Sequence, residues 1–163
     1  MDVLILRKSI RLNAIGLVWA FDKPAAASTI GPVTDSDPIY HICKRAEWEA
    51  AERAGLYPGS SQDAADGFIH FSTRAQVVAS AAKHRKGQSD LVLLAVDPVR
   101  VSQILKWEPG GYGGIPQEPL VRGGQLFPHL YGPLPVTAVV RVDPLPLGPD
   151  GAHVFPAGFP GVP

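Results

Sequence analysis

The segment Asp90–Asp97 (DLVLLAVD) constrains the fold of this chain most, because six apolar residues follow one another between two acids. An uninterrupted apolar run of this length is typical of a central strand, since strands with one solvated face alternate apolar and polar residues. We therefore expect the chain to build a sheet around this segment.

The remaining pattern adds more strands and two helices. Further strands are expected over the short apolar segments Ile39–Cys43, Gly67–Ser72, Ile104–Glu108 and Val136–Val142. Helices are expected over Lys44–Ala54, which stops at Gly55, and from Thr73 to about Lys83, where Thr73 and Gln76 form a capping-box pattern. Strands outnumber helices and both helices come early. This arrangement predicts an α+β fold with a mixed or antiparallel sheet.

The composition divides the chain into three parts. The domain is expected over residues 38–143. Residues 1–37 lack a sustained amphipathic pattern and are expected to form a disordered or loosely attached leader, with a weak secretory signal as the alternative. Residues 144–163 are dense in Pro and Gly, which predicts an irregular, mobile tail. Loops are expected over 56–66 and 110–124, because both segments contain Pro and Gly.

Charge and cysteine content exclude several classes of protein. The chain has 15 basic and 15 acidic residues, and Lys and Arg are spread along the sequence, so a nucleic-acid partner is not expected. The apolar run in the leader is too short to span a bilayer. The single cysteine, Cys43, excludes an internal disulfide and fits a buried thiol in a reducing, cytoplasmic compartment.

Several catalytic motifs are absent from the sequence. It holds no dinucleotide-binding GxGxxG after a strand, no phosphate loop, no GxSxG, no HExxH and no CxxC. The sequence therefore points to no resident metal, although a site built from histidines of separate strands stays open as an alternative.

Three histidines in short aromatic segments are the candidate site. His41 lies in IYHIC, His70 in GFIHFST and His129 in FPHLYG. We predict that they share one pocket and act as catalytic groups, because an imidazole exchanges protons near neutral pH. The competing interpretations are a buried, hydrogen-bonded His41 and a His129 that only packs in a turn.

Strand alternation sharpens the prediction for His70. Side chains of a strand point alternately to two faces, so Ile69 and Phe71 are expected in the core. Phe68, His70 and Ser72 would then share the opposite face. The hydroxyl of Ser72 is a candidate ligand-binding group, with a role at the start of the following helix as the alternative.

Four segments carry a resemblance to a known family: IYHICKRAEWEAAERAGLY, DGFIHFSTRAQV, LAVD and FPHLYGPL. In this order they resemble the bacterial family known as domain of unknown function 952 (DUF952), from Ile39 to about Val142. That family has no established activity. Its fold is similar to the ADP-ribosyltransferase fold, a split, mixed sheet that grips NAD.

The resemblance to ADP-ribosyltransferases and RNA 2′-phosphotransferases implies roles for single residues. His41 stands where those enzymes have the His of a His-Gly-Thr motif, while Ile42 and Cys43 replace the Gly and Thr. The strand around His70 is similar to their His-Ile-His-Phe strand. The resemblance implies an NAD site made by Tyr40, His41, His70 and Ser72. Only Glu108 and Glu118 lie near the place of the later catalytic Glu.

Three functions follow as hypotheses. The first is a cytoplasmic enzyme that binds NAD or another nucleotide and transfers a group to a small-molecule or protein acceptor. The second is a non-catalytic domain that binds a nucleotide or another small ligand. The third is a metal-assisted enzyme that uses the three histidines.

Overall fold

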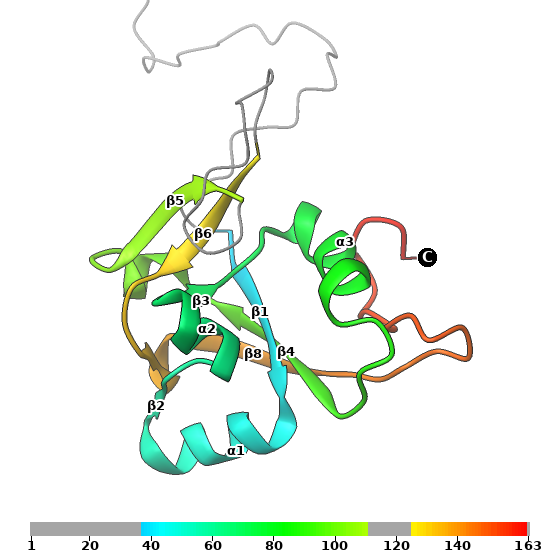
Figure 1. Ribbon diagram of the computed structural model, residues 1–163, viewed down its shortest axis with the longest axis horizontal. Coiled ribbons are helices and arrows are strands. Elements are labelled where there is room, and N and C mark those ends of the chain that lie inside the picture. Colours follow the sequence, from blue (N-terminus) through cyan, green and yellow to red (C-terminus); the bar gives the residue numbers. More distant parts are fainter. Residues whose placement is uncertain (1–36, 111–124, 163) are drawn as a thin grey trace, which may run out of the picture. The chain divides into compact units, whose positions relative to one another are not determined.

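The computed structural model describes residues 37–110 and 125–162 (Figure 1). The strands are β1 Ile39–Lys44, β2 Leu56–Tyr57, β3 Ile69–His70, β4 Leu91–Val96, β5 Leu105–Pro109, β6 Leu126–Leu130, β7 Leu134–Pro135 and β8 Val139–Leu145. The helices are α1 Arg45–Ala54, α2 Ser61–Asp66 and α3 Arg74–His84, with short 3-10 turns at Pro98–Val101 and Val136–Ala138. Leader residues 1–36 and loop residues 111–124 lie outside the described part of the chain.

Within the described residues the strands form three antiparallel sheets, in the orders β1-β4-β8, β2-β7 and β3-β6-β5. The α+β class is confirmed in this coarse form. Of the two expected arrangements, mixed or antiparallel, the antiparallel one is found, since every strand pair among the described residues is antiparallel. No described helix carries one strand into a parallel neighbour.

The central position predicted for Asp90–Asp97 is confirmed. β4 lies between β1 and β8, and all six of its residues are buried. Val92, Leu94 and Val96 pack into one apolar cluster, whereas Leu91, Leu93 and Ala95 pack into a second. Because each face of the sheet carries its own core, the strand has no face on which polar residues would be stabilised.

Different elements cover the two faces. Trp48 and Ala51 of α1 join the first cluster, while Val77 and Ala81 of α3 join the second. The second cluster also contains Phe155 and Phe159, and Figure 1 shows the C-terminal segment (red) beside α3.

The segment after Asp143 is therefore part of the packed domain, where the sequence predicted a mobile tail. Phe159 packs edge-on against the Tyr40 ring at 5.1 Å between ring centres. The guanidinium of Arg74 lies 5.2 Å from the ring centre of Phe159, and its Nη1 donates to the carbonyl of Gly158. Two buried aromatic rings anchor the segment even though it has no helical or strand periodicity.

Both predicted helices are present, and a third was not predicted. α1 ends at Gly55, whose φ of 80° is a left-handed conformation that favours glycine. α3 begins after Thr73, as the capping pattern indicated. The segment predicted as a loop over 56–66 contains α2. This helix begins after Ser60, whose side chain accepts a hydrogen bond from the backbone N–H of Asp63.

The predicted strand Gly67–Ser72 is divided between two sheets. Its pairing with β6 covers only Ile69 and His70, and Ser72 then forms an isolated bridge with Tyr40 of β1. Ile69 and Phe71 lie in the first apolar cluster, as alternation predicted. The last strand begins at Val139 instead of Val136. None of the helices in the described ranges is long and apolar enough to cross a bilayer.

Candidate functional site

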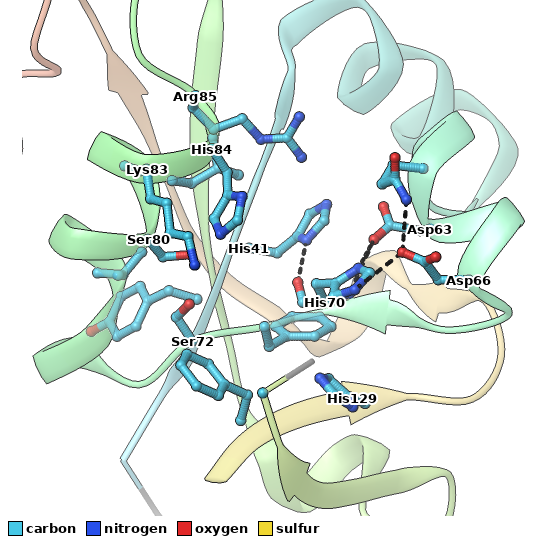
Figure 2. Close-up of a pocket in the computed structure, with 18 of the residues that line it drawn as sticks. His41, Asp63, Asp66, His70, Ser72, Ser80, Lys83, His84, Arg85 and His129 are labelled. Atoms are coloured by element: carbon cyan, nitrogen blue, oxygen red, sulfur yellow. Dashed lines mark hydrogen bonds and ion pairs between the residues drawn. The ribbon is translucent and has the colours of Figure 1, made fainter. Parts of the chain in front are cut away.

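A cavity of about 600 Å³ lies where the chain passes from β3 to its bridge with β1. Its lining comes from β1, α2, β3, α3 and β6, and it includes all three predicted histidines. Figure 2 shows His41 and His70 in the middle, with Asp63 and Asp66 on one side and Lys83, His84 and Arg85 on the other. The cavity thus has one acidic wall and one basic wall.

His70 is held by two carboxylates of α2. Its Nδ1 donates to Oδ1 of Asp63 at 2.8 Å, and its Nε2 lies 3.4 Å from Oδ2 of Asp66. The His70 side chain is 39% exposed, whereas the Asp63 side chain is 2% exposed. Because an ionised carboxylate only accepts hydrogen bonds, Asp63 fixes the proton on Nδ1 and leaves Nε2 to exchange protons.

Asp63 is a buried carboxylate, and each of its two oxygens accepts two hydrogen bonds. Its two oxygens accept hydrogen bonds from the backbone N–H and hydroxyl of Ser60, and from the backbone N–H and Nδ1 of His70. Burial by itself would raise the pKa of Asp63. The hydrogen bonds from His70 and Ser60, together with the nearby His41, outweigh burial and hold that pKa well below its ordinary value.

His129 forms a second carboxylate–imidazole pair. It faces His70 across the β3–β6 ladder, and its Nδ1 donates to Oε2 of Glu108 at 2.9 Å. The Tyr131 hydroxyl donates to the same oxygen at 2.8 Å. Burial lowers the pKa of His129, and the hydrogen bond to Glu108 offsets this only in part. The donors in turn lower the pKa of Glu108.

His41 is buried, and both of its ring nitrogens are engaged. Nδ1 donates to the carbonyl of His70 at 2.6 Å, and Nε2 lies 3.1 Å from the Tyr57 hydroxyl. Burial lowers the pKa of His41, so the ring is neutral and Nε2 accepts from Tyr57. In this arrangement His41 positions the backbone of β3, and its ring lines the cavity without a nitrogen left for a ligand.

Tyr40 and Ser72 also line the cavity, and they contribute in different ways. Their backbones exchange two hydrogen bonds, of 2.8 and 2.9 Å, which join β1 to the chain after β3. The Tyr40 ring is buried against Phe159, so it belongs to the core below the cavity. Ser72 is buried beside the cavity and remains the candidate hydroxyl.

The sequence pointed to the histidines but not to the carboxylates of α2. Asp63 and Asp66 both lie in the segment 56–66, which the sequence predicted as a loop. The available signal was Ser60-Ser61-Gln62-Asp63, which has the Ser-x-x-Asp pattern of a capping box. Glu108 was named as a nearby candidate and lies beside His129. Glu118 lies outside the described residues.

A metal site and a reactive cysteine find no support in the described residues. Within 37–110 and 125–162, no three His, Cys, Asp or Glu side chains are arranged to hold a metal ion. The thiol of Cys43 is buried, and burial raises its pKa to about 12, which leaves it protonated at neutral pH.

The chain belongs to the family described as "Protein of unknown function (DUF952)", which matches residues 42–142. The family resemblance drawn from the sequence is thereby confirmed. A crystal structure of protein CC0527 from Caulobacter crescentus is similar at 46% identity, with a TM-score of 0.62 over 71% of this chain and 92% of that chain. The solution NMR structure of CC0527 has a TM-score of 0.57 over 71% and 90%. No curated protein matches the chain.

Proposed function

We propose that the chain is an enzyme that binds a nucleotide in the cavity, with NAD as the donor, and transfers a group to a small-molecule or protein acceptor. One observation carries the proposal. The Asp63–His70 pair stands in the same cavity as the cationic side chains of Lys83 and Arg85. An oriented imidazole supplies acid–base catalysis, and basic groups attract phosphate.

The size and lining of the cavity support a nucleotide ligand. Cavities that hold small ligands measure about 300–1,000 Å³, and this one falls within that range at about 600 Å³. The rings of Phe71 and Phe127 add apolar lining for a base or a pyridine ring. Phosphates would lie at the basic wall, since the acidic wall repels them.

The finer fold assignment, an ADP-ribosyltransferase-like fold, belongs to the same proposal. Its support is the separation of β1-β4-β8 from β3-β6-β5, with a single bridge from Tyr40 to Ser72 between the two sheets. The cavity lies at this bridge, where a split sheet would grip its ligand. A cytoplasmic location is proposed with it, because the only cysteine is a buried, protonated thiol.

A second candidate is a non-catalytic domain that binds a nucleotide or another small ligand. Ile42 favours it, because this residue is buried in the second apolar cluster at the place where the related transferases have a Gly. A branched side chain there takes up space that a close contact between the backbone and nicotinamide needs.

Titration calorimetry with NAD tests the proposal, followed by an assay for nicotinamide release. We expect wild type to bind NAD, and His70→Asn to bind it about 2- to 13-fold more weakly, which corresponds to one neutral hydrogen bond. His153→Asn is the matched control, because His153 does not line the cavity. Binding without nicotinamide release would favour the second candidate, and no binding of NAD would refute the first.

A further inference from the structure

The two carboxylate–imidazole pairs face each other across one ladder. His70 and His129 are direct partners in the β3–β6 pairing, with ring centres 5.5 Å apart and planes inclined by 73°. In each ring, the Nδ1–H donates a hydrogen bond to a carboxylate. The distance is 2.8 Å from His70 to Asp63 and 2.9 Å from His129 to Glu108. The cavity therefore contains two imidazoles with the same tautomer, each with Nε2 as its proton-exchanging atom.

His129 differs in this respect from the buried His41. Both nitrogens of His41 are hydrogen-bonded to protein groups. In contrast, the Nε2 of His129 has no hydrogen-bond partner within residues 37–110 and 125–162. Because only Nδ1 of His129 is bound to a described protein group, Nε2 is the nitrogen of this ring that can meet a ligand in the cavity.

The two rings differ in burial and in their charged neighbours. His70 is accessible, and its Nε2 lies 3.4 Å from a carboxylate oxygen of Asp66. His129 is buried against Phe68, with ring centres 4.2 Å apart, and burial lowers its pKa. The other titratable or charged groups around the pair are His41, Glu108, Tyr131, Lys83, His84 and Arg85.

We propose that His129 is the base and His70 the acid of one reaction, and that the substrate is a phosphate ester whose leaving group is an alkoxide. The hydroxyl of the acceptor gives its proton to Nε2 of His129, and its oxygen bonds to phosphorus. The phosphorus–oxygen bond to the leaving group breaks, and the departing oxygen keeps the electron pair and takes the Nε2 proton of His70. His129 gains one proton and His70 loses one, so the number of protons is unchanged. The acceptor is the only co-reactant.

The need for an acid distinguishes this chemistry from nicotinamide release. Nicotinamide leaves NAD as a neutral pyridine and needs no proton, whereas an alkoxide is a poor leaving group until it is protonated. A cavity with both an acid and a base therefore suits phosphoryl transfer. This inference rests on the proposed function, since it places the phosphate of the ligand in the same cavity.

Two esters of adenosine monophosphate test the assignment with water as the acceptor. The ethyl ester needs an acid, whereas the p-nitrophenyl ester does not, because p-nitrophenolate is already a stable anion. We expect His129→Asn to slow both hydrolyses by about 10²–10⁴-fold. We expect His70→Asn to slow the ethyl ester by a similar factor and the p-nitrophenyl ester by less than about 10-fold. His153→Asn should change neither rate.

The outcomes are distinct. In wild type, the alkaline limb of the kcat/KM profile should be present for the ethyl ester and absent for the p-nitrophenyl ester. Equal losses for both esters in His70→Asn would overturn its role as the acid, and full activity of His129→Asn would overturn its role as the base.

Consumption of NAD without hydrolysis of either ester would overturn the inference and leave the proposed function intact. If neither NAD nor either ester binds, both fail. Binding of adenosine monophosphate by His129→Asn serves as the check that this variant is folded.

Discussion

The Asp63–His70 and Glu108–His129 pairs have the same chemistry and opposite burial. In the first, the carboxylate is 2% exposed and the imidazole 39%. In the second, the carboxylate is 35% exposed and the imidazole 7%. The exposure of each carboxylate is expected to determine what its loss costs in stability, because solvent screens an exposed ion pair. One hydrogen-bonded motif thus buries its carboxylate in the first pair and its imidazole in the second.

The origin of each carboxylate explains the difference. Asp63 lies in the first turn of α2, where it is enclosed by Ser60 and by the strand that follows. Glu108 lies on β5, the edge strand of its sheet, two positions along from the residue opposite His129. A carboxylate at an edge keeps contact with water even when it accepts two hydrogen bonds.

The largest expected effect comes from removing the buried carboxylate. Asp63→Ala should lower the free energy of unfolding by about 3–5 kcal/mol, because His70 and two backbone N–H groups lose their acceptor. Glu108→Ala is the matched variant and should cost less than about 1 kcal/mol, since solvent screens an exposed pair. Urea unfolding of both variants measures the difference. Equal costs would show that burial does not separate the two pairs.

The second prediction concerns how the stability of the folded protein depends on pH. Burial lowers the pKa of His41 and of His129 in the folded protein, so below about pH 6.5 the unfolded chain binds protons that the folded one does not. Stability should therefore fall as the pH drops from 7 to 5, by at most about 1.4 kcal/mol per pH unit for each histidine. A further loss should begin below about pH 4, where Asp63 is protonated in the unfolded chain but remains ionised in the fold.

His129→Asn tests whether His129 contributes to the loss of stability between pH 7 and 5. Urea unfolding at several pH values should show a shallower slope between pH 7 and 5 in this variant, and an unchanged loss below about pH 4. A variant slope equal to that of wild type would mean that His129 does not titrate differently in the two states.

The helices, strands and C-terminal segment of the domain differ in how far the sequence determines them. β4, α1 and α3 follow from local patterns: an apolar run, a helix ended by Gly55, and the capping residues of α3. α2 was missed because Pro58 and Gly59 indicate a loop and six residues are too few to show periodicity. The C-terminal segment was missed because two separated phenylalanines fix it, and such anchors have no repeating pattern.

The candidate site likewise contains residues that the sequence predicted and residues that it missed. Strand alternation placed Phe68, His70 and Ser72 apart from the core residues, and the three histidines do line one cavity. The carboxylates could not be assigned in the same way. The Asp63–His70 contact depends on the turn at Gly67 between helix and strand, and the Glu108–His129 contact depends on the register of β5 against β6. Neither is visible until distant segments are placed in space.

A smaller effect is expected for Glu108→Gln. The change should cost less than about 1 kcal/mol, because the pair is partly exposed. It should also lower the pKa of the Tyr131 hydroxyl, which the hydrogen bond to Glu108 now raises. Ultraviolet absorbance titration of the tyrosines in wild type and variant detects the shift. An unchanged tyrosine titration would contradict the contact between Tyr131 and Glu108.

The smallest expected effect belongs to Tyr131→Phe. Phenylalanine keeps the ring that packs on Phe68 and lies 4.0 Å from Nζ of Lys106, and it removes only an exposed hydroxyl. The free energy of unfolding should change by less than about 0.5 kcal/mol. The Nδ1 proton of His129 should still be visible by NMR, because Glu108 accepts it through the same oxygen with or without Tyr131. Loss of that proton signal in a stable variant would show that Tyr131 holds Glu108 in place. The second pair would then be a three-residue unit, and its exposed carboxylate would depend on a neighbour in a way that the buried Asp63 does not.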